Sequence, residues 1–263
     1  MRHQLYDEQR LPFEDLEKVG LAKDGKLNLD NDDLQALLSG RRTSMLRLEN
    51  LFSDGLQIPH LDAKLSLKPN TNGSLDLLVH PIYRVAEAPN FLTADETLAP
   101  EKGEVPNVDR TYFDDKGDLR DVLVEFDKET NEFIVIGQER ILVPDRVNGE
   151  YLTFEQKERY RRGKKVELPD GTTIQYSATD KNGVRSNKLA LIASILIDGG
   201  LSFALYHGLN HLFGEKKHSE DADVYPKGYY ADLEQLEEQE RQRENFIQPE
   251  NQYSRSYTRT GSR

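Results

Sequence analysis

The chain has 263 residues, a length that allows one large domain or two smaller domains with tails. Asp and Glu number 47 against 35 Lys and Arg, so the formal net charge is −12. An acidic surface disfavours broad, non-specific coating of DNA but leaves room for a local basic patch. The absence of cysteine excludes disulfides, a thiolate nucleophile and cysteine-ligated metal centres. We expect a cytoplasmic protein, because the charged first residues also lack the apolar run of a secretory signal.

Three short helices are predicted by residues that favour helix ends. Each begins at an Asp or Thr that can cap the first turn and ends at a glycine ten residues later. The pairs are Asp30 with Gly40, Thr93 with Gly103, and Thr153 with Gly163. In the second pair we expect Pro100 to break the last turn. The pattern indicates a repeated unit in which a short capped helix is followed by strands.

Strand-forming residues surround turn sequences in residues 65–79, 122–136 and 166–176, and each stretch is predicted to form a β-hairpin. Helices interspersed with hairpins indicate an α+β fold rather than a doubly wound parallel sheet. We expect an N-terminal α+β domain over residues 9–85 and a C-terminal one over residues 110–214. The linker between them, residues 86–109, is rich in Pro, Asp and Glu.

The last part of the chain, residues 215–263, is polar, and we expect it to be largely disordered. Within it, residues 233–244 are acidic and helix-prone. Residues 251–263 are rich in Ser, Thr, Tyr and Arg, a composition that predicts disorder.

The most apolar segment, residues 189–213, leaves three interpretations open. It is predicted as a broken apolar helix, and it could instead form a hairpin packed in the core or against another copy. As a helix it would be long enough to cross the ~30 Å core of a bilayer, although Asp198 makes insertion costly. The third interpretation is a helix docked on a partner. The residues expected to contact a partner or membrane are Leu191, Ile195, Asp198, Ser202 and Tyr206.

Searches for catalytic and metal-binding patterns give no candidate. His207 and His211 are spaced four residues apart, but Gly208 stands where a zinc protease motif has Glu. The acidic residues from Asp24 to Asp33 do not have the spacing of a calcium loop. There is no phosphate-binding glycine loop and no Gly-x-Ser-x-Gly elbow. We therefore expect no cofactor, no metal and no enzymatic activity.

The strongest charge feature is the run from residue 159 to residue 165, in which five of seven residues are basic. It consists of Arg159, Tyr160, Arg161, Arg162, Gly163, Lys164 and Lys165. One interpretation is a solvated helix end, because cations offset the helix dipole and pair with nearby Glu. The other is contact with nucleic acid or an acidic partner, in which the tyrosine would stack on a base. Arg41 and Arg42, which follow Gly40, are assigned to the same kind of contact.

Two groups of motifs carry a resemblance to uncharacterised domain families. Residues 11–17, 37–43, 61–67 and 80–83 resemble one family, and residues 151–168, 176–179 and 189–200 resemble a second. Both families occur in conjugative transposons and integrated mobile elements of gut anaerobes. There they lie beside, or fused to, type IA topoisomerases, helicases and methyltransferases. The resemblance implies a genetic context and no chemistry, because neither family brings an activity to any residue of this chain.

Together these features predict a non-catalytic accessory or adaptor protein of a mobile genetic element. We expect it to bind a partner protein, such as a DNA-processing enzyme of the element, or nucleic acid, and it could form homo-oligomers. The alternative is a membrane-associated component of a conjugative transfer apparatus, anchored by residues 189–213.

Overall fold

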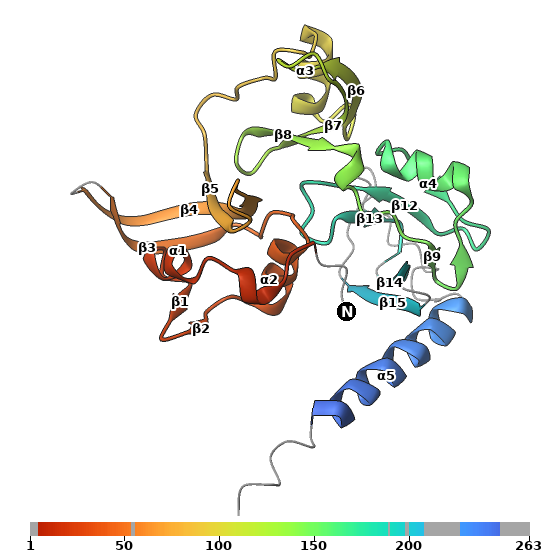
Figure 1. Ribbon diagram of the computed structural model, residues 1–263. Helices are drawn as coiled ribbons and strands as arrows, with labels where there is room; N and C mark the ends of the chain where they lie inside the picture. Colours follow the sequence, from red (N-terminus) through yellow and green to blue (C-terminus); the bar gives the residue numbers. More distant parts are fainter. Residues whose placement is uncertain (1–4, 54–55, 189, 198–199, 208–226, 248–263) are drawn as a thin grey trace, which may run out of the picture.

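The computed structural model describes residues 5–53, 56–188, 190–197, 200–207 and 227–247. It has the expected α+β class, with short helices and small antiparallel sheets (Figure 1). Three lobes follow one another along the chain, and a long C-terminal helix projects away from them.

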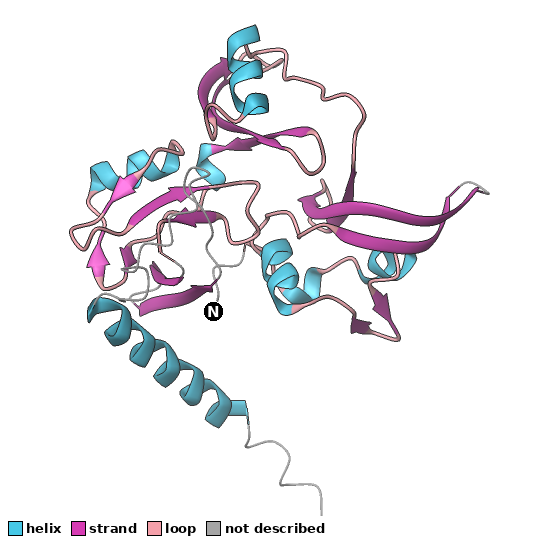
Figure 2. Cartoon of the chain, turned by 180° about the vertical axis from the view of Figure 1, so that it is seen from behind, coloured by secondary structure: helices cyan, strands magenta, loops and turns pink. Residues whose placement is uncertain are grey.

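The first lobe is a three-stranded meander of β3 (Leu46–Ser53), β4 (Leu56–Pro69) and β5 (Leu75–Pro81). Two helices, α1 (Phe13–Lys18) and α2 (Asn31–Leu38), lie along one side of this sheet, as both views show (Figures 1 and 2). Shorter elements complete the lobe: η1 (Glu8–Arg10), β1 (Ala22–Lys23) and β2 (Lys26–Leu27). Its core buries Leu16, Leu37, Leu38, Leu48 and Leu65. The hairpin predicted over residues 65–79 is confirmed by the pairing of β4 with β5.

The second lobe contains α3 (Ala94–Lys102) and the sheet of β6 (Val108–Phe113), β7 (Leu119–Asp127) and β8 (Glu132–Gly137). The segment expected as a linker thus holds α3 and the first residues of β6. Thr93 and Glu96 form a capping box, as the sequence predicts. The expectation that Pro100 breaks the last turn is wrong. The helix continues to Lys102 because the N–H groups of Gly103 and Glu104 donate to the carbonyls of Pro100 and Ala99, closing a Schellman turn.

The third lobe has two small sheets, ordered β10-β9-β14-β15 and β11-β12-β13. Its elements are η2 (Gln138–Arg140), β9 (Arg146–Val147), β10 (Glu150–Tyr151), α4 (Phe154–Arg161), β11 (Val166–Glu167), β12 (Thr173–Tyr176) and β13 (Val184–Ser186). The predicted hairpins over residues 122–136 and 166–176 are confirmed by β7 with β8 and by β11 with β12. The apolar core of this lobe also takes in Leu123 and Ile134 from the second lobe.

The apolar segment is a strand pair, so the predicted broken helix is wrong. Strands β14 (Ala190–Ile197) and β15 (Gly200–His207) pair over their whole length, with Leu191 opposite Tyr206 and Ile195 opposite Ser202. Leu191 and Ile192 are buried, which favours the hairpin packed in the core over the other two interpretations. Beta-branched Ile residues and an Asp-Gly connection favour a hairpin locally, but an apolar run of this kind fits either state. Asp198 lies outside the described residues.

A helix also lies in the part expected to be largely disordered: α5 (Lys227–Ile247), which contains the helix-prone residues 233–244. Its first turns pack Tyr229, Leu233 and Leu236 against Ala190 and Ile192 of β14, and the rest extends from the body (Figures 1 and 2). The expected disorder of residues 251–263 concerns a segment outside the described residues. None of the helices in the described ranges is long and apolar enough to span a membrane.

Buried charges join the first lobe to the β7–β8 hairpin. Lys64 of β4 lies 2.9 Å from Asp127 of β7, and both side chains are 2% exposed. Arg42 lies 2.7 Å from Glu132 of β8, which also contacts His80 Nδ1 at 3.2 Å. The opposite ring nitrogen, His80 Nε2, is hydrogen-bonded to Ser66 Oγ at 2.8 Å. We call these groups the charged junction.

The Lys64–Asp127 pair provides a test of the junction. Asp127→Ala would leave the buried ammonium of Lys64 with only the exposed Glu129 as a partner. We expect the free energy of unfolding to fall by about 3–5 kcal/mol, as when one member of a buried pair is removed. Urea denaturation measures the change. The matched control is Asp62→Ala, whose carboxylate pairs with Arg47 on the surface and should matter far less. Equal effects would contradict a dominant role for the junction.

Glu132 makes the junction sensitive to acid. Burial raises the pKa of its carboxyl, but hydrogen bonds from His80 and Arg42 outweigh this effect and bring the pKa to about 2. Because this folded-state pKa is below the ordinary value of about 4.3, the carboxylate stabilises the fold above that value and loses its contribution as the pH falls toward about 2.

We therefore expect Glu132→Gln to be less stable than the intact protein at neutral pH and to lose less stability between about pH 5 and about pH 3. Denaturation curves at several pH values measure both effects. Glu87→Gln, at an exposed position, is the control and should follow the intact protein. Parallel pH profiles for Glu132→Gln and the intact protein would show that this carboxylate is not the acid-sensitive group.

Candidate functional site

The basic run forms the end of α4 and the turn into β11. Thr153 and Gln156 make the predicted capping box at the start of the helix, and Gly163 ends it in the left-handed conformation, with φ 65°. The carbonyl of Gly163 accepts hydrogen bonds from Asn107 Nδ2 at 2.8 Å and Gln175 Nε2 at 2.6 Å. The turn is therefore held by the side chain of Asn107, in the loop before β6, and by that of Gln175 in β12.

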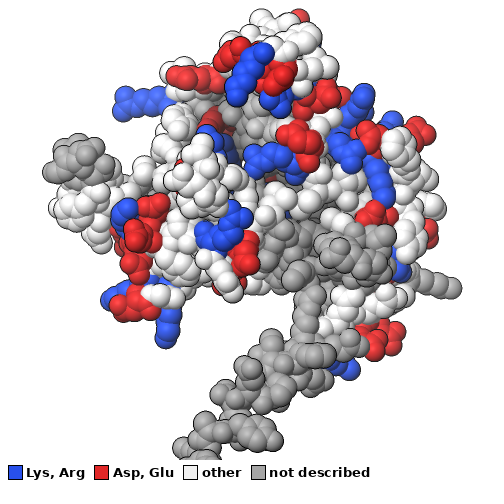
Figure 3. Space-filling model, in the orientation of Figure 1, with Lys and Arg blue, Asp and Glu red and all other residues white. Residues whose placement is uncertain are grey.

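Four cations of this turn face solvent: Arg159, Arg162, Lys164 and Lys165. We call them the basic turn. The guanidinium of Arg159 donates to the carbonyl of Lys165, which holds two ends of the turn together. Within the described residues, Arg159, Arg162 and Lys164 form no salt bridge with a carboxylate. On the face shown in Figure 3, cations and acids are interspersed, so a cluster of one sign is a local feature.

Three residues that the sequence predicts to contact nucleic acid or an acidic partner are not part of the basic turn. Tyr160 is 4% exposed and packs in the core of the third lobe, so the expected stacking of this ring on a base is wrong. Arg161 is half-buried and pairs with Glu158 in the same helix. Arg42 is 9% exposed in the charged junction, where Glu132 takes up its charge. Helix geometry explains the first result, because successive side chains point about 100° apart around a helix, so Tyr160 can face the core while Arg159 faces solvent.

An open hollow of about 610 Å³ lies beside the basic turn. Gln175, whose amide donates to the carbonyl of Gly163, lines it, together with Phe126, Lys128 and Arg185. Arg185 contacts the buried carboxyl of Glu125 at 3.4 Å. Burial raises the pKa of Glu125, and the charge of Arg185 opposes that shift. Glu104, Asp127 and Glu129 also line the hollow, which therefore combines an aromatic ring with groups of both charges next to the basic turn.

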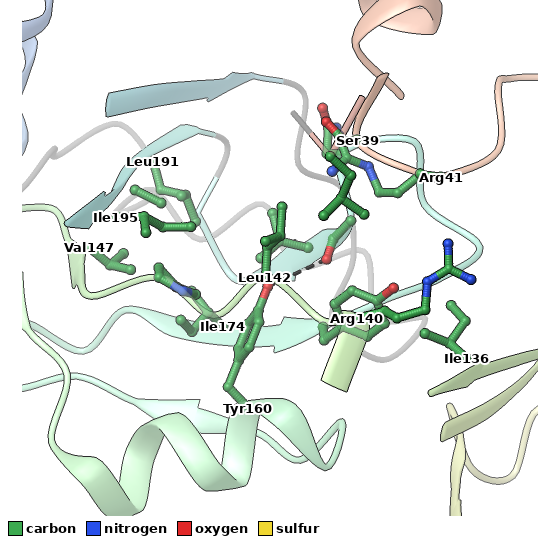
Figure 4. Close-up of a pocket in the computed structure, with 18 residues that line it drawn as sticks. Ser39, Arg41, Ile136, Arg140, Leu142, Val147, Tyr160, Ile174, Leu191 and Ile195 are labelled. Carbon is green, nitrogen blue, oxygen red and sulfur yellow. Dashed lines mark hydrogen bonds between the residues drawn. The ribbon is translucent and has the colours of Figure 1, made fainter. Parts of the chain in front are cut away.

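A second cavity, of about 80 Å³, lies where the first lobe meets the third (Figure 4). Arg41 follows α2, Arg140 ends η2, and Tyr160 and Tyr176 come from α4 and β12. Figure 4 shows Arg41 and Arg140 on one side, Val147, Leu191 and Ile195 on the opposite side, and Tyr160 rising between them from its helix. The cavity therefore has a cationic end and an apolar end.

The sequence predicts that Arg41 contacts nucleic acid or an acidic partner, and it gives no role to Arg140 or Tyr176. Arg41 donates from Nε to the carbonyl of Lys181 at 2.8 Å, and Arg140 donates to Tyr6 Oη at 3.0 Å. No spacing in the sequence could have brought these groups together, because each comes from a different element. Among the described residues no cluster of three or more His, Cys, Asp or Glu side chains has the arrangement of a metal site.

Comparison with known proteins identifies one domain. Residues 6–89 match the model of a family described as a protein of unknown function (DUF4099), and they include the elements from η1 to β5. No curated protein matches the chain. No solved structure matches it either. The N-terminal part of the chain therefore contains an uncharacterised domain, in agreement with the resemblance of its sequence motifs.

Gly163 shapes the basic turn, and its substitution tests that role. A Cβ at this position would lie 2.7 Å from Leu123 Cδ1, and the left-handed φ disfavours any side chain. We expect Gly163→Ala to lower the free energy of unfolding by about 2–4 kcal/mol, from the backbone conformation and the overpacking together. Gly171→Ala is the control, because its φ is 76° and no atom lies within 4 Å of its Cβ. If denaturation curves show the same loss of stability in both variants, the close packing beneath the turn does not contribute to the effect of the substitution.

Proposed function

We propose that the chain is a non-catalytic accessory protein that binds nucleic acid through the basic turn. The observation that carries this proposal is the exposure of four cations at one rigid turn of a protein whose net charge is −12. Clustered cations are what phosphates require, and Arg159, Arg162 and Lys164 form no salt bridge with a carboxylate within the described part of the chain.

The hollow beside the turn favours a single-stranded nucleic acid over a duplex. Proteins that bind single strands combine cations for the backbone with aromatic rings on which bases stack. Phe126 lines the hollow, which adjoins the turn through Gln175 and Gly163, so its ring offers a stacking surface beside the cations of the turn. A duplex buries its bases and would meet only the cations of the turn.

The genetic context of this function rests on the sequence. The motifs of both predicted domains resemble families found in conjugative transposons and other mobile elements, beside enzymes that process DNA. We propose that the protein assists such an enzyme in the cytoplasm, and that contact with nucleic acid is its part of the task. A protein partner for the same turn is the competing possibility.

Binding of a labelled single-stranded oligonucleotide tests the proposal. Neutralising about four phosphates on a single strand predicts a slope of about −3 for log K against log salt concentration. We expect replacement of Arg159, Arg162, Lys164 and Lys165 by Ala to remove most of this salt-dependent binding. Fluorescence anisotropy at several salt concentrations measures both the affinity and the slope.

The matched control replaces four other exposed cations, Lys23, Lys26, Lys68 and Arg84, by Ala and therefore changes the net charge equally. It should retain the affinity and slope of the intact protein. No binding by the intact protein at low salt would overturn the proposal and favour a protein partner. If both variants lost the same affinity, net charge alone would account for binding and the basic turn would not be the site.

A further inference from the structure

We propose that the cavity between the first and third lobes binds a small aliphatic carboxylate, with its carboxylate at Arg41 and Arg140 and its hydrocarbon part against Leu191 and Ile195. This ligand site is separate from the basic turn, and it does not depend on the proposed binding of nucleic acid.

The cationic end of the cavity lacks a neutralising partner. Arg41 and Arg140 donate to a carbonyl and a phenolic oxygen, both uncharged, and neither guanidinium forms a salt bridge with any described carboxylate. Asp180 is close enough to feel the charge of Arg41, but burial raises the pKa of its carboxyl and the two do not pair. Arg41 is half-buried and Arg140 is exposed at this end, and a planar carboxylate matches the fork of either guanidinium.

Tyr176 supplies a hydrogen-bond donor that has no partner within the described residues. Its side chain lines the cavity, is 8% exposed, and packs edge-on against Tyr160 with ring centroids 6.1 Å apart. Burial raises the pKa of its hydroxyl well above the ordinary value, an effect that Glu125 adds to and that Arg41 and Arg140 oppose. The hydroxyl therefore keeps its proton and needs an acceptor, which a carboxylate oxygen provides. A cationic ligand would be repelled by the two arginines and would offer no acceptor to this hydroxyl.

The opposite end selects for hydrocarbon of limited length. Val147 and Leu191 are buried, and Ile195 closes the same wall (Figure 4). A cavity of about 150 Å³ lined by such residues holds benzene, so the 80 Å³ found here suits an alkyl chain of about three carbon atoms, as in butyrate, whose carboxylate would then lie beside the exposed Arg140. Long fatty acids and nucleotides exceed this space. Inorganic anions would leave the apolar end empty.

A ligand in this cavity would touch residues from two lobes, because Arg41 belongs to the first and Leu191 and Ile195 to the third. It would bind only the folded arrangement in which those walls face each other. Binding must then stabilise the folded protein as the ligand concentration rises above Kd. A thermal shift is thus a second readout, independent of any effect on nucleic acid.

Isothermal titration of the full chain with butyrate tests the inference, with butyramide as the uncharged analogue and phosphate as the anion without an apolar part. We expect saturable binding of butyrate, a matching rise of the melting temperature, and binding of the other two at least about tenfold weaker. Absence of saturable binding of butyrate overturns the inference. Equal affinity for butyramide or phosphate also overturns it, because the site would then lack the two ends described above.

Two conservative variants locate the site. Tyr176→Phe removes only the hydroxyl and should weaken butyrate binding by about threefold to tenfold, while Arg140→Gln removes a charge near the surface and should weaken it by tenfold or more. Arg84→Gln, an exposed cation outside the cavity, is the control and should bind like the intact protein. Circular dichroism establishes that each variant is folded. Unchanged affinity in folded Tyr176→Phe and Arg140→Gln would place the ligand elsewhere and overturn the assignment.

Discussion

The salt bridge between Lys64 and Asp127 fixes where the first lobe meets the β7–β8 hairpin of the second. Both groups are almost fully buried, and a buried ammonium costs several kcal/mol in lost hydration unless a carboxylate stands beside it. Strand β4 therefore has to meet the end of β7 at one position. Arg42, His80 and Glu132 repeat the constraint a few residues away, where two cationic or hydrogen-bonding groups converge on one carboxylate. The first lobe has an apolar core of its own, so these charges, and not a shared core, attach it to the β7–β8 hairpin.

This arrangement creates the cavity and leaves the basic turn outside it. The loop after α2 carries Arg41 against the third lobe, where it lines the cavity with Arg140 and Tyr176. The basic turn belongs to the third lobe alone and is held by Asn107 and Gln175 from below. The two candidate sites thus use different faces of the third lobe. The cavity depends on the position of the first lobe, and the turn does not.

Several local features of this structure could be predicted because they depend on neighbours in the chain. The caps at Asp30, Thr93 and Thr153 are bonds between residues three apart, and the left-handed glycines at the ends of these helices follow from backbone sterics. Pro100 shows the limit of such rules, since a Schellman turn closed the helix in spite of it. Residues 190–207 show another limit. Their apolar run fits a buried helix or a buried strand, and only pairing with β9 and packing under α5 decide between them.

The sequence by itself determined the α+β class, the ends of the short helices, the three predicted hairpins and the presence of a dense basic run. It could not determine the environment of each charge. Arg42 and Arg162 both lie within two residues of the glycine that ends a short helix, yet one is buried against Glu132 and the other faces solvent. That difference arises from residues remote in the chain, because hydration and ion pairing depend on which segments fold together. The grouping of Arg41, Arg140 and Tyr176 has the same origin, and only the tertiary structure could reveal it.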